Sequence, residues 1–208
     1  RPLETIDQEV FMVRRENKKA LLTDLLKPNE FSSALIFART KRGADHLAHY
    51  LKKKGYPSGA YHGDKSQRER ERVLGAFKTK KIQVLIATDV AARGIDIDQL
   101  SHVINYDMPE TKETYMHRIG RTARAGATGR AWSLCSPEER HLLSAIQQHI
   151  GFKLKQNLDH AYLIPANQIV EKRPPTRDSK KKKPYGSRHK NKQRSYQKSF
   201  KAKTHKYA

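Results

Sequence analysis

Strand-like and helix-like patterns alternate along this chain from residue 6 to about residue 150, which restricts the possible folds severely. The apolar runs 34–38 and 82–87 have the length of strands that are buried on both faces. Between such strands, apolar residues recur at helical spacing in helices such as the one that Gly55 closes. Strands separated by helices pair in parallel, so the sequence predicts an α/β fold with helices on both faces of a parallel sheet.

The remaining elements follow the same alternation. Further strands are expected at 6–13, 59–62, 102–106 and 130–135, and further helices at 17–26, from Ser66, at 111–119 and from Ser136. Ser66 to Glu69 and Ser136 to Glu139 each have the spacing of a capping box. Ligands of parallel sheets bind at the carboxyl ends of the strands. We therefore expect a site in the loops that follow Ala38, His62, Ala87 and Tyr106.

The basic charge is concentrated at the C-terminal end of the chain. Residues 161–208 hold 15 of the 43 Lys and Arg residues but only two of the 21 Asp and Glu residues. Such a segment buries too little apolar surface to offset its ordering entropy, so we expect a disordered tail at 171–208 after a junction at 151–170. Tyr185, Tyr196, Phe200 and Tyr207 interleave with its cations. This pattern favours RNA binding, although a solubilising tail or a nuclear address has the same charge.

The cysteine content limits the chemistry and the compartment. Cys135 is the single cysteine, which excludes an internal disulfide and a cysteine-based zinc site. This composition suits a reducing compartment, and we expect the cytoplasm, most simply that of a bacterium. The apolar runs are too short to span a membrane. The chain begins at Arg1 without a methionine, so we interpret it as a fragment of a longer protein.

Three arginines at regular spacing form the clearest chemical motif. Arg118, Arg121 and Arg124 recur at every third position among glycines and other small residues. Forked guanidinium donors match phosphate oxygens, and small neighbours allow a phosphate chain to approach. A surface salt-bridge cluster is the alternative for an arbitrary arginine triplet. The small neighbours and the position after a predicted strand favour a phosphate site.

Two further segments have weaker signals when each is taken alone. Thr88 follows a buried strand and could help to hold a phosphate, while Asp96 could accept hydrogen bonds from a ribose or could simply form a turn. Gln67 and Arg70 share the first turn of a helix beside its positive end, although an exposed charged helix would look the same. Gly63 and Asp64 before this helix are ordinary turn residues.

Together, these segments resemble the C-terminal RecA-like domain of DEAD-box RNA helicases. Residues 35–41 look like motif IV of that family, Gln67 and Arg70 like the adjoining RNA-contacting motif, 87–96 like motif V and 117–126 like motif VI. The order and spacing also agree. The sequences of residues 37–41 and 62–67 are most similar to those of the bacterial RhlE-like subgroup. Ala123 stands where the family usually has glycine.

The resemblance implies a nucleotide site shared with another domain. Arg121 and Arg124 would be catalytic arginine fingers that reach the γ-phosphate of ATP, and Asp96 would bind the ribose beside Gly94. The ATP and its Mg²⁺ would be held mainly by an N-terminal RecA-like domain, with residues 1–5 as a remnant of the linker to it. His117 and Arg118 would help to join the two domains. The residues expected to grip the RNA backbone are Thr40, Gly63, Gln67, Arg70 and Thr88.

Two motifs of such an enzyme are absent from the chain. It has neither a P-loop nor the Asp-Glu-Ala-Asp sequence, so the fragment alone is expected to hydrolyse no ATP. The leading hypothesis is the C-terminal half of an ATP-dependent RNA helicase that unwinds short duplexes locally. Two alternatives stay open, a DNA-translocating helicase of the same superfamily and a non-catalytic RNA-binding module on a RecA-like scaffold.

Overall fold

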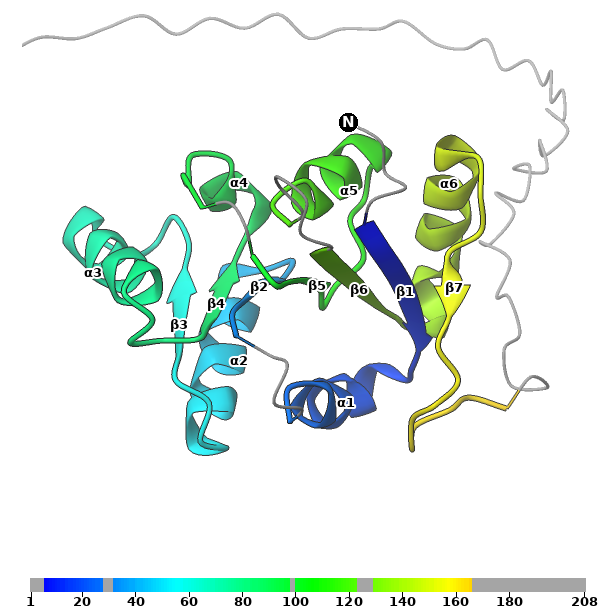
Figure 1. Cartoon of the computed structure of the whole chain (residues 1–208), viewed down its shortest axis with the longest axis horizontal. Helices are drawn as coiled ribbons and strands as arrows, with labels where there is room; N and C mark the ends of the chain where they lie inside the picture. The colour runs from blue at the N-terminus through cyan, green and yellow to red at the C-terminus, as the bar shows by residue number, and fades with distance from the viewer. Residues whose placement is uncertain (1–5, 28–31, 98–99, 123–128, 166–208) are drawn as a thin grey trace, which may run out of the picture. The chain divides into compact units, whose positions relative to one another are not determined.

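A computed structural model describes residues 6–27, 32–97, 100–122 and 129–165. The chain divides into two units, Arg1–Lys172 and Arg173–Ala208, and the second lies outside the described residues, as does the tail predicted at 171–208. The described part of the first unit is a seven-stranded sheet flanked by helices (Figure 1). The predicted α/β fold is therefore confirmed.

The sheet is parallel in each of its pairings. Its strands lie in the order β3-β4-β2-β5-β6-β1-β7. Their bounds are β1 Ile6–Met12, β2 Ala34–Phe37, β3 Ser58–Tyr61, β4 Val84–Ala87, β5 His102–Asn105, β6 Gly129–Cys135 and β7 Lys155–Gln156. The first six match the predicted strands to within about two residues. β7 was not predicted, because two exposed residues carry no periodic pattern.

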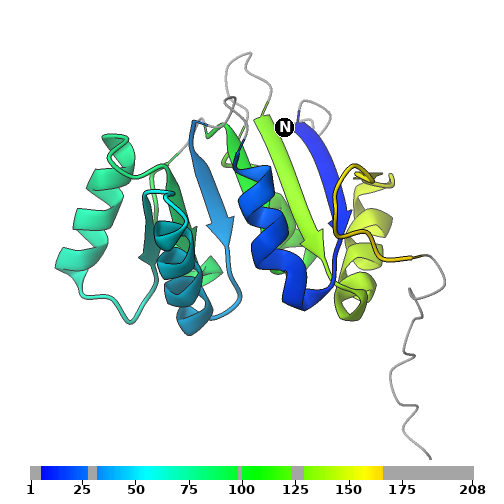
Figure 2. The same ribbon diagram turned by 90° about the horizontal axis from the view of Figure 1, so that it is seen from below.

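The helices cover both faces of the sheet. Their bounds are α1 Lys18–Leu25, α2 Lys41–Lys53, α3 Gln67–Lys78, α4 Asp89–Ala92, α5 Lys112–Ile119 and α6 Arg140–Ile150, with short 3-10 turns η2 Arg15–Asn17 and η3 Pro137–Glu139. Figure 2 shows α1 and α2 in front of one face. Both capping boxes are present, at Ser66 and at Ser136. The predicted last helix differs in its first turn, which is 3-10 before α6 begins.

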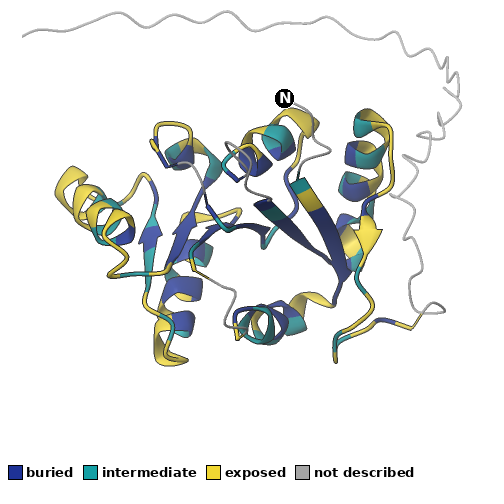
Figure 3. Cartoon of the chain, viewed as in Figure 1, coloured by how far each residue is buried: buried dark blue, intermediate teal, exposed yellow. Residues whose placement is uncertain are grey.

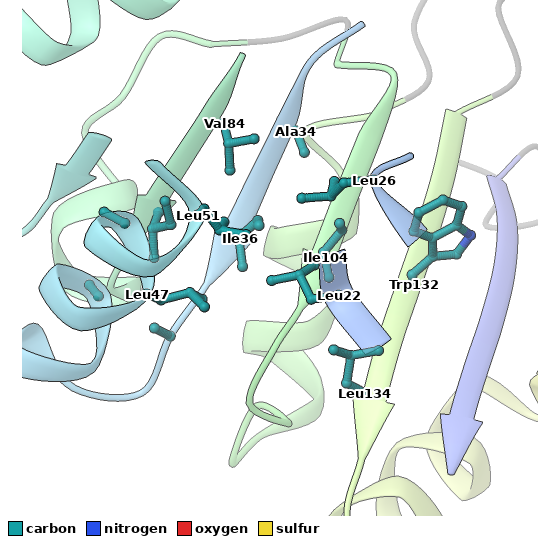
Figure 4. Packing of buried hydrophobic residues seen from close by; sticks show 14 of the residues in the cluster. Leu22, Leu26, Ala34, Ile36, Leu47, Leu51, Val84, Ile104, Trp132 and Leu134 are labelled. Carbon is teal, nitrogen blue, oxygen red and sulfur yellow. The ribbon is translucent and has the colours of Figure 1, made fainter. Parts of the chain in front are cut away.

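Side-chain alternation along the strands separates the core into layers. In β2, Ala34 and Ile36 pack with α1 and α2, whereas Leu35 and Phe37 pack on the opposite face with α3 and α4. Figure 4 shows the first layer, in which Leu22 and Leu47 approach Ile36 and Ile104. Burial is concentrated along the strands and the inner helix surfaces (Figure 3). A sheet that is covered on both faces leaves the strand ends free for ligands.

Candidate functional site

The loops that the sequence predicts as ligand-binding leave four neighbouring strands. β3, β4, β2 and β5 lie consecutively in the sheet. Because they are parallel, their carboxyl ends meet at one edge, and the loops that follow them lie in a row. The candidate site residues therefore come together although they are spread from residue 40 to residue 121 of the sequence.

Arg118 is held inside the domain by oxygen atoms from two of these loops and the end of β5. Its Nε and Nη2 donate to the two carboxylate oxygens of Asp89 at 2.7 and 2.8 Å. Its Nη1 donates to Asn105 Oδ1 at 3.0 Å and to the Asp107 carbonyl at 2.8 Å. The guanidinium carbon lies 4.8 Å from the centre of the Phe37 ring. Arg118 thus fixes α5 to the segments that follow β4, β5 and β2.

These contacts all lie within one domain, and the expected role of Arg118 in joining two domains stays a prediction. Only 3% of the side chain is exposed, and four of its hydrogen bonds are made within the domain. It is a positioning group here. Sequence reasoning missed its partners Asp89, Asn105 and Asp107 as site residues, although short polar residues after buried strands are a usable signal.

Arg121 has a different environment, three residues further along. Its Nη1 donates to the Ile95 carbonyl at 2.9 Å. Within the described part of the chain, no carboxylate forms an ion pair with it. It lines a pocket at the carboxyl edge together with His117, which is exposed. A half-buried guanidinium that binds a neutral carbonyl keeps its charge available for an anion. Arg124 lies outside the described residues.

Gly94 and Asp96 are both accessible. The Asp96 side chain is 95% exposed, with its nearest cation, Lys78 Nζ, at 4.0 Å. A Cβ atom added at Gly94 would meet nothing within 4 Å. Packing inside this domain therefore does not require glycine at position 94. The open space there is compatible with the close approach of a ligand.

The two threonines occupy helix N-caps. Thr40 Oγ1 accepts a hydrogen bond from Gly43 N at 3.0 Å at the start of α2, and the residue is exposed. Thr88 precedes α4 and makes no capping bond with its side chain. Thr88 is adjacent to Asp89, the carboxylate that Arg118 holds. Thr40 is thus an exposed cap at the carboxyl edge, whereas Thr88 is only 7% exposed at the start of α4.

Gln67 and Arg70 lie in the first turn of α3. Gln67 Nε2 donates to Glu71 Oε1 at 2.6 Å. Arg70 Nε is buried and has no hydrogen-bond partner. Gly63 lies in the loop before the helix, where a Cβ atom would be 3.8 Å from Lys41 Cε. The loops after β2 and β3 are therefore in contact, and one donor of Arg70 is left for a ligand or a water molecule.

A buried histidine supports the loop that carries Gly63. His62 is 2% exposed, and its Nε2 lies 3.0 Å from Asp45 Oδ2 without the alignment of a hydrogen bond. Lys65 Nζ lies 2.9 Å from the other oxygen of Asp45. Burial raises the pKa of Asp45, but Lys65 and His62 outweigh this effect, and the pKa is lowered. The carboxylate therefore ties this loop to α2.

A buried carboxylate, Glu139 after β6, connects the segments that follow β1, β2 and β5. Glu139 accepts hydrogen bonds from Lys18 Nζ at 2.6 Å and from Arg39 Nη2 at 3.0 Å. Lys18 is 2% exposed and also donates to the Tyr106 carbonyl at 2.8 Å. Burial raises the pKa of Glu139, and Lys18 reverses this effect, so that the pKa is lowered. Sequence reasoning missed this network, because its members are more than 20 residues apart along the chain.

Two kinds of feature are absent from the described ranges. These ranges contain no group of three or more His, Cys, Asp or Glu side chains that could hold a metal ion. Their helices are too short or too polar to cross a membrane.

Comparison with known proteins identifies the family. The family model described as helicase conserved C-terminal domain matches residues 17–126. The chain is 45% identical over 151 residues to the ATP-dependent RNA helicase DbpA of Bacillus subtilis, covering 73% of this chain and 32% of DbpA. The chain belongs to the DEAD-box RNA helicases. The ATP-dependent RNA helicase vasa of Drosophila melanogaster is 44% identical over 140 residues, covering 67% of this chain and 21% of vasa.

Solved structures of DEAD-box proteins have the same fold. The E. coli DEAD-box protein SrmB, bound to regulator of ribonuclease activity A, has a TM-score of 0.69 and 37% identity, with 83% of this chain and 95% of that chain covered. S. cerevisiae Dbp5 bound to RNA and ADP BeF3 has a TM-score of 0.69 and 36% identity, with 74% and 42% covered. The chain spans about a third or less of the curated DEAD-box relatives that it matches.

Proposed function

We propose that this chain is the C-terminal half of an ATP-dependent DEAD-box RNA helicase and that it completes an ATP site carried mainly by an N-terminal RecA-like domain. Arg121 carries this proposal. Its guanidinium lies at the carboxyl edge of the sheet, lines a pocket and binds a neutral carbonyl. An arginine placed in this way can stabilise charge that develops on a phosphate held by a facing domain.

The residues of motifs V and VI fit ATP. Asp96 is free to accept ribose hydroxyl groups, and the open space at Gly94 admits the nucleotide. Arg121 and Arg124 would face its phosphates, and the exposed His117 would face the second domain. Cleavage of the phosphoanhydride bond of ATP would drive the cycle of domain closure and opening. The N-terminal domain would hold the Mg²⁺ ion. In this arrangement, Arg118 acts inside the domain by fixing α5.

The RNA strand would lie on the loops after β3, β4 and β2. Thr40, Thr88 and Gln67 offer uncharged donors, Arg70 offers a cation with an unsatisfied Nε, and Gly63 allows close backbone approach. These groups match phosphate and sugar oxygens, so the grip would have little sequence selectivity. Asp89 follows Thr88 in the chain and accepts two hydrogen bonds from Arg118, which lies three residues before Arg121. The proposed RNA surface and the proposed ATP site are therefore linked through Arg118. Closure of the two domains would then bend one strand and open a short duplex.

The bacterial relatives support a proposal for the cellular setting. DbpA and CshA of Bacillus subtilis are bacterial, and Cys135 is a free cysteine. We place the protein in the bacterial cytoplasm on this basis.

Substitution of Arg121 tests the proposal in the full-length gene product. We expect Arg121→Ala to lower RNA-stimulated ATP turnover by on the order of a thousandfold, because the developing phosphate charge loses a guanidinium. RNA affinity should change little. Steady-state ATPase assays and RNA titrations measure the two effects. Arg72→Ala, which removes an exposed arginine of α3, is the control and should turn over normally. Normal turnover by Arg121→Ala would exclude the arginine-finger role.

A further inference from the structure

Resting on the proposed function, we propose that Asp64 distinguishes RNA from DNA by accepting a hydrogen bond from a ribose 2′-hydroxyl group. Asp64 follows Gly63 in the loop between β3 and α3. From the sequence alone it is an ordinary turn residue, and the proposed ATP and RNA contacts give it no role.

The turn that carries Asp64 is anchored on both sides of it. Lys65 N donates to the His62 carbonyl at 3.1 Å, which closes the turn. The buried His62 ring lies 3.0 Å from Asp45 Oδ2, and Lys65 Nζ lies 2.9 Å from Asp45 Oδ1. Because Asp45 belongs to α2, both side chains attach the turn to that helix. The backbone of Asp64 therefore has a defined position beside Gly63.

The Asp64 side chain does not stabilise the turn in which it lies. An aspartate that does so accepts a hydrogen bond from the backbone two residues further on. The N–H group at that position, Ser66 N, donates instead to Glu69 Oε2 at 3.0 Å. Among the described residues, the only donor to the Asp64 carboxylate is Lys41 Nζ. Turn formation thus does not account for a carboxylate at position 64.

The ion pair of Asp64 with Lys41 spans the loops that carry two proposed RNA contacts. Lys41 follows Thr40, and a Cβ atom at Gly63 would lie 3.8 Å from Lys41 Cε. Both partners are accessible, with 51% of the Lys41 side chain and 66% of the Asp64 side chain exposed. The ammonium group offsets the repulsion between this carboxylate and RNA phosphates. Asp64 can therefore lie against an RNA backbone.

The chemistry of that backbone limits what the carboxylate can bind. An ionised carboxylate only accepts hydrogen bonds, and no donor in the described part of the chain binds Oδ2 of Asp64. Phosphate oxygens are acceptors as well. The ribose 2′-hydroxyl group is the donor that the RNA backbone offers, and DNA lacks it. On a surface that holds the backbone, Asp64 therefore favours RNA through this group.

Two strands that differ only at the 2′ position test the inference. Binding of fluorescent single-stranded oligo(U) and oligo(dU) is measured with the full-length gene product and a non-hydrolysable ATP analogue. We expect Asp64→Ala to lower the preference for oligo(U) by about tenfold, as for loss of one hydrogen bond to a charged group. The lost negative charge acts on both strands, so it cancels in the ratio of the two affinities.

Asp24→Ala is the matched control. Asp24 also forms an exposed ion pair with a lysine, Lys27, at 2.6 Å, but it lies in α1, outside the loops that carry Thr40 and Gly63. Its substitution should leave the preference for oligo(U) unchanged. Because both ion pairs are exposed, each variant should keep its Tm within about 2 °C of the wild type.

Removal of single hydroxyl groups from the RNA locates the contact. With one deoxyribose placed at successive positions of oligo(U), the wild type should lose about tenfold in affinity at one position to which Asp64→Ala is insensitive. A purely structural role of Asp64 would weaken binding of all these strands alike. The inference is wrong if the wild type binds oligo(U) and oligo(dU) equally, if Asp64→Ala keeps the full preference, or if every deoxyribose affects both proteins equally.

Arg70→Ala separates this inference from the proposed function. If Asp64→Ala keeps the preference for oligo(U) while Arg70→Ala weakens RNA binding, only the role of Asp64 is wrong. If Arg70→Ala also binds RNA normally, the proposed RNA surface is wrong as well.

Discussion

Arg118 and Arg121 lie three positions apart in one motif, yet their surroundings give them different tasks. Arg118 is buried and shares four hydrogen bonds with Asp89, Asn105 and the Asp107 carbonyl. Arg121 is half-buried and binds one carbonyl. The first arginine holds the helix in place, and the second is available to a ligand. Motif spacing alone does not distinguish the two roles, because both arginines belong to the same three-residue repeat.

The planar fork of Arg118 is essential to its role. We expect Arg118→Lys to destabilise the domain by about 3 kcal/mol, since lysine keeps the charge but cannot bind both Asp89 oxygens and the Asp107 carbonyl. Chemical denaturation of the chain measures this change. Arg72→Lys on the surface of α3 is the matched control and should leave the free energy of unfolding within about 0.5 kcal/mol of the wild type. Equal stability of the two variants would contradict the structural role of Arg118.

Helix α3 depends on its first turn, which also carries Gln67 and Arg70. Ser66 Oγ accepts the Glu69 N–H at 3.3 Å, and Glu69 Oε2 accepts the Ser66 N–H at 3.0 Å. The cap therefore orders the turn from which both candidate RNA contacts project. The short loop from His62 to Ser66 then sets the distance of this turn from the sheet.

Removal of the cap should loosen the RNA contacts of α3. We expect Ser66→Ala to lower the free energy of unfolding by about 1 kcal/mol and to weaken RNA binding, whereas Ser66→Thr retains an N-cap and changes both little. Denaturation curves and RNA titrations measure the two effects. The cap would be dispensable for binding if Ser66→Ala lost stability without loss of RNA affinity.

The elements were largely predictable, whereas their mutual contacts were not. Apolar runs such as 34–38 and the capping boxes are local patterns, and local patterns determine where strands and helices form. The hydrogen bond between Arg39 and Asp107 and the ion pair of Lys18 with Glu139 join residues 68 and 121 positions apart. Such pairs depend on strand order, which a single sequence does not specify.

In the first unit, the chain after α6 crosses the edge of the sheet. β7 pairs with β1, and Lys155 Nζ and Asn157 Nδ2 bind the two oxygens of Glu9 at 2.6 and 2.9 Å. Further on, His160 approaches Phe11 with 5.8 Å between ring centres, and Ile164 is buried. Residues 154–164 thus form part of the folded domain, at the far side of the sheet from β3.

His160 should make stability depend on pH near neutrality. Its Nδ1 accepts the Tyr162 N–H at 3.3 Å, and burial lowers its pKa, which Asp159 only partly opposes. Because the unfolded chain then binds protons more readily than the folded chain, stability should fall as the pH falls through about 6.5 and below. Denaturation at several pH values measures this slope. His160→Asn should reduce it, whereas His141→Asn at an exposed site should not; equal slopes would exclude the role of His160.

The charge of the tail at 171–208 indicates a contribution to RNA affinity that is separate from that of the folded domain. We expect deletion of residues 171–208 to weaken RNA binding and to flatten its dependence on salt, because fewer cations then displace counterions from the RNA. Titrations at several salt concentrations measure both. The folded domain should retain its Tm. Unchanged affinity and salt dependence would show that the tail is no RNA anchor.

The position of β1 between β6 and β7 has a consequence for the order of assembly during synthesis. β1 leaves the ribosome before the other strands of this sheet, but the strands on either side of it are the last two of the seven, with registers that pair Ile6 with Gly129 and Glu9 with Lys155. The nascent chain must therefore hold an apolar strand without neighbours until more than 120 further residues have been translated. The half of the sheet formed by β2 to β5 can assemble in the meantime.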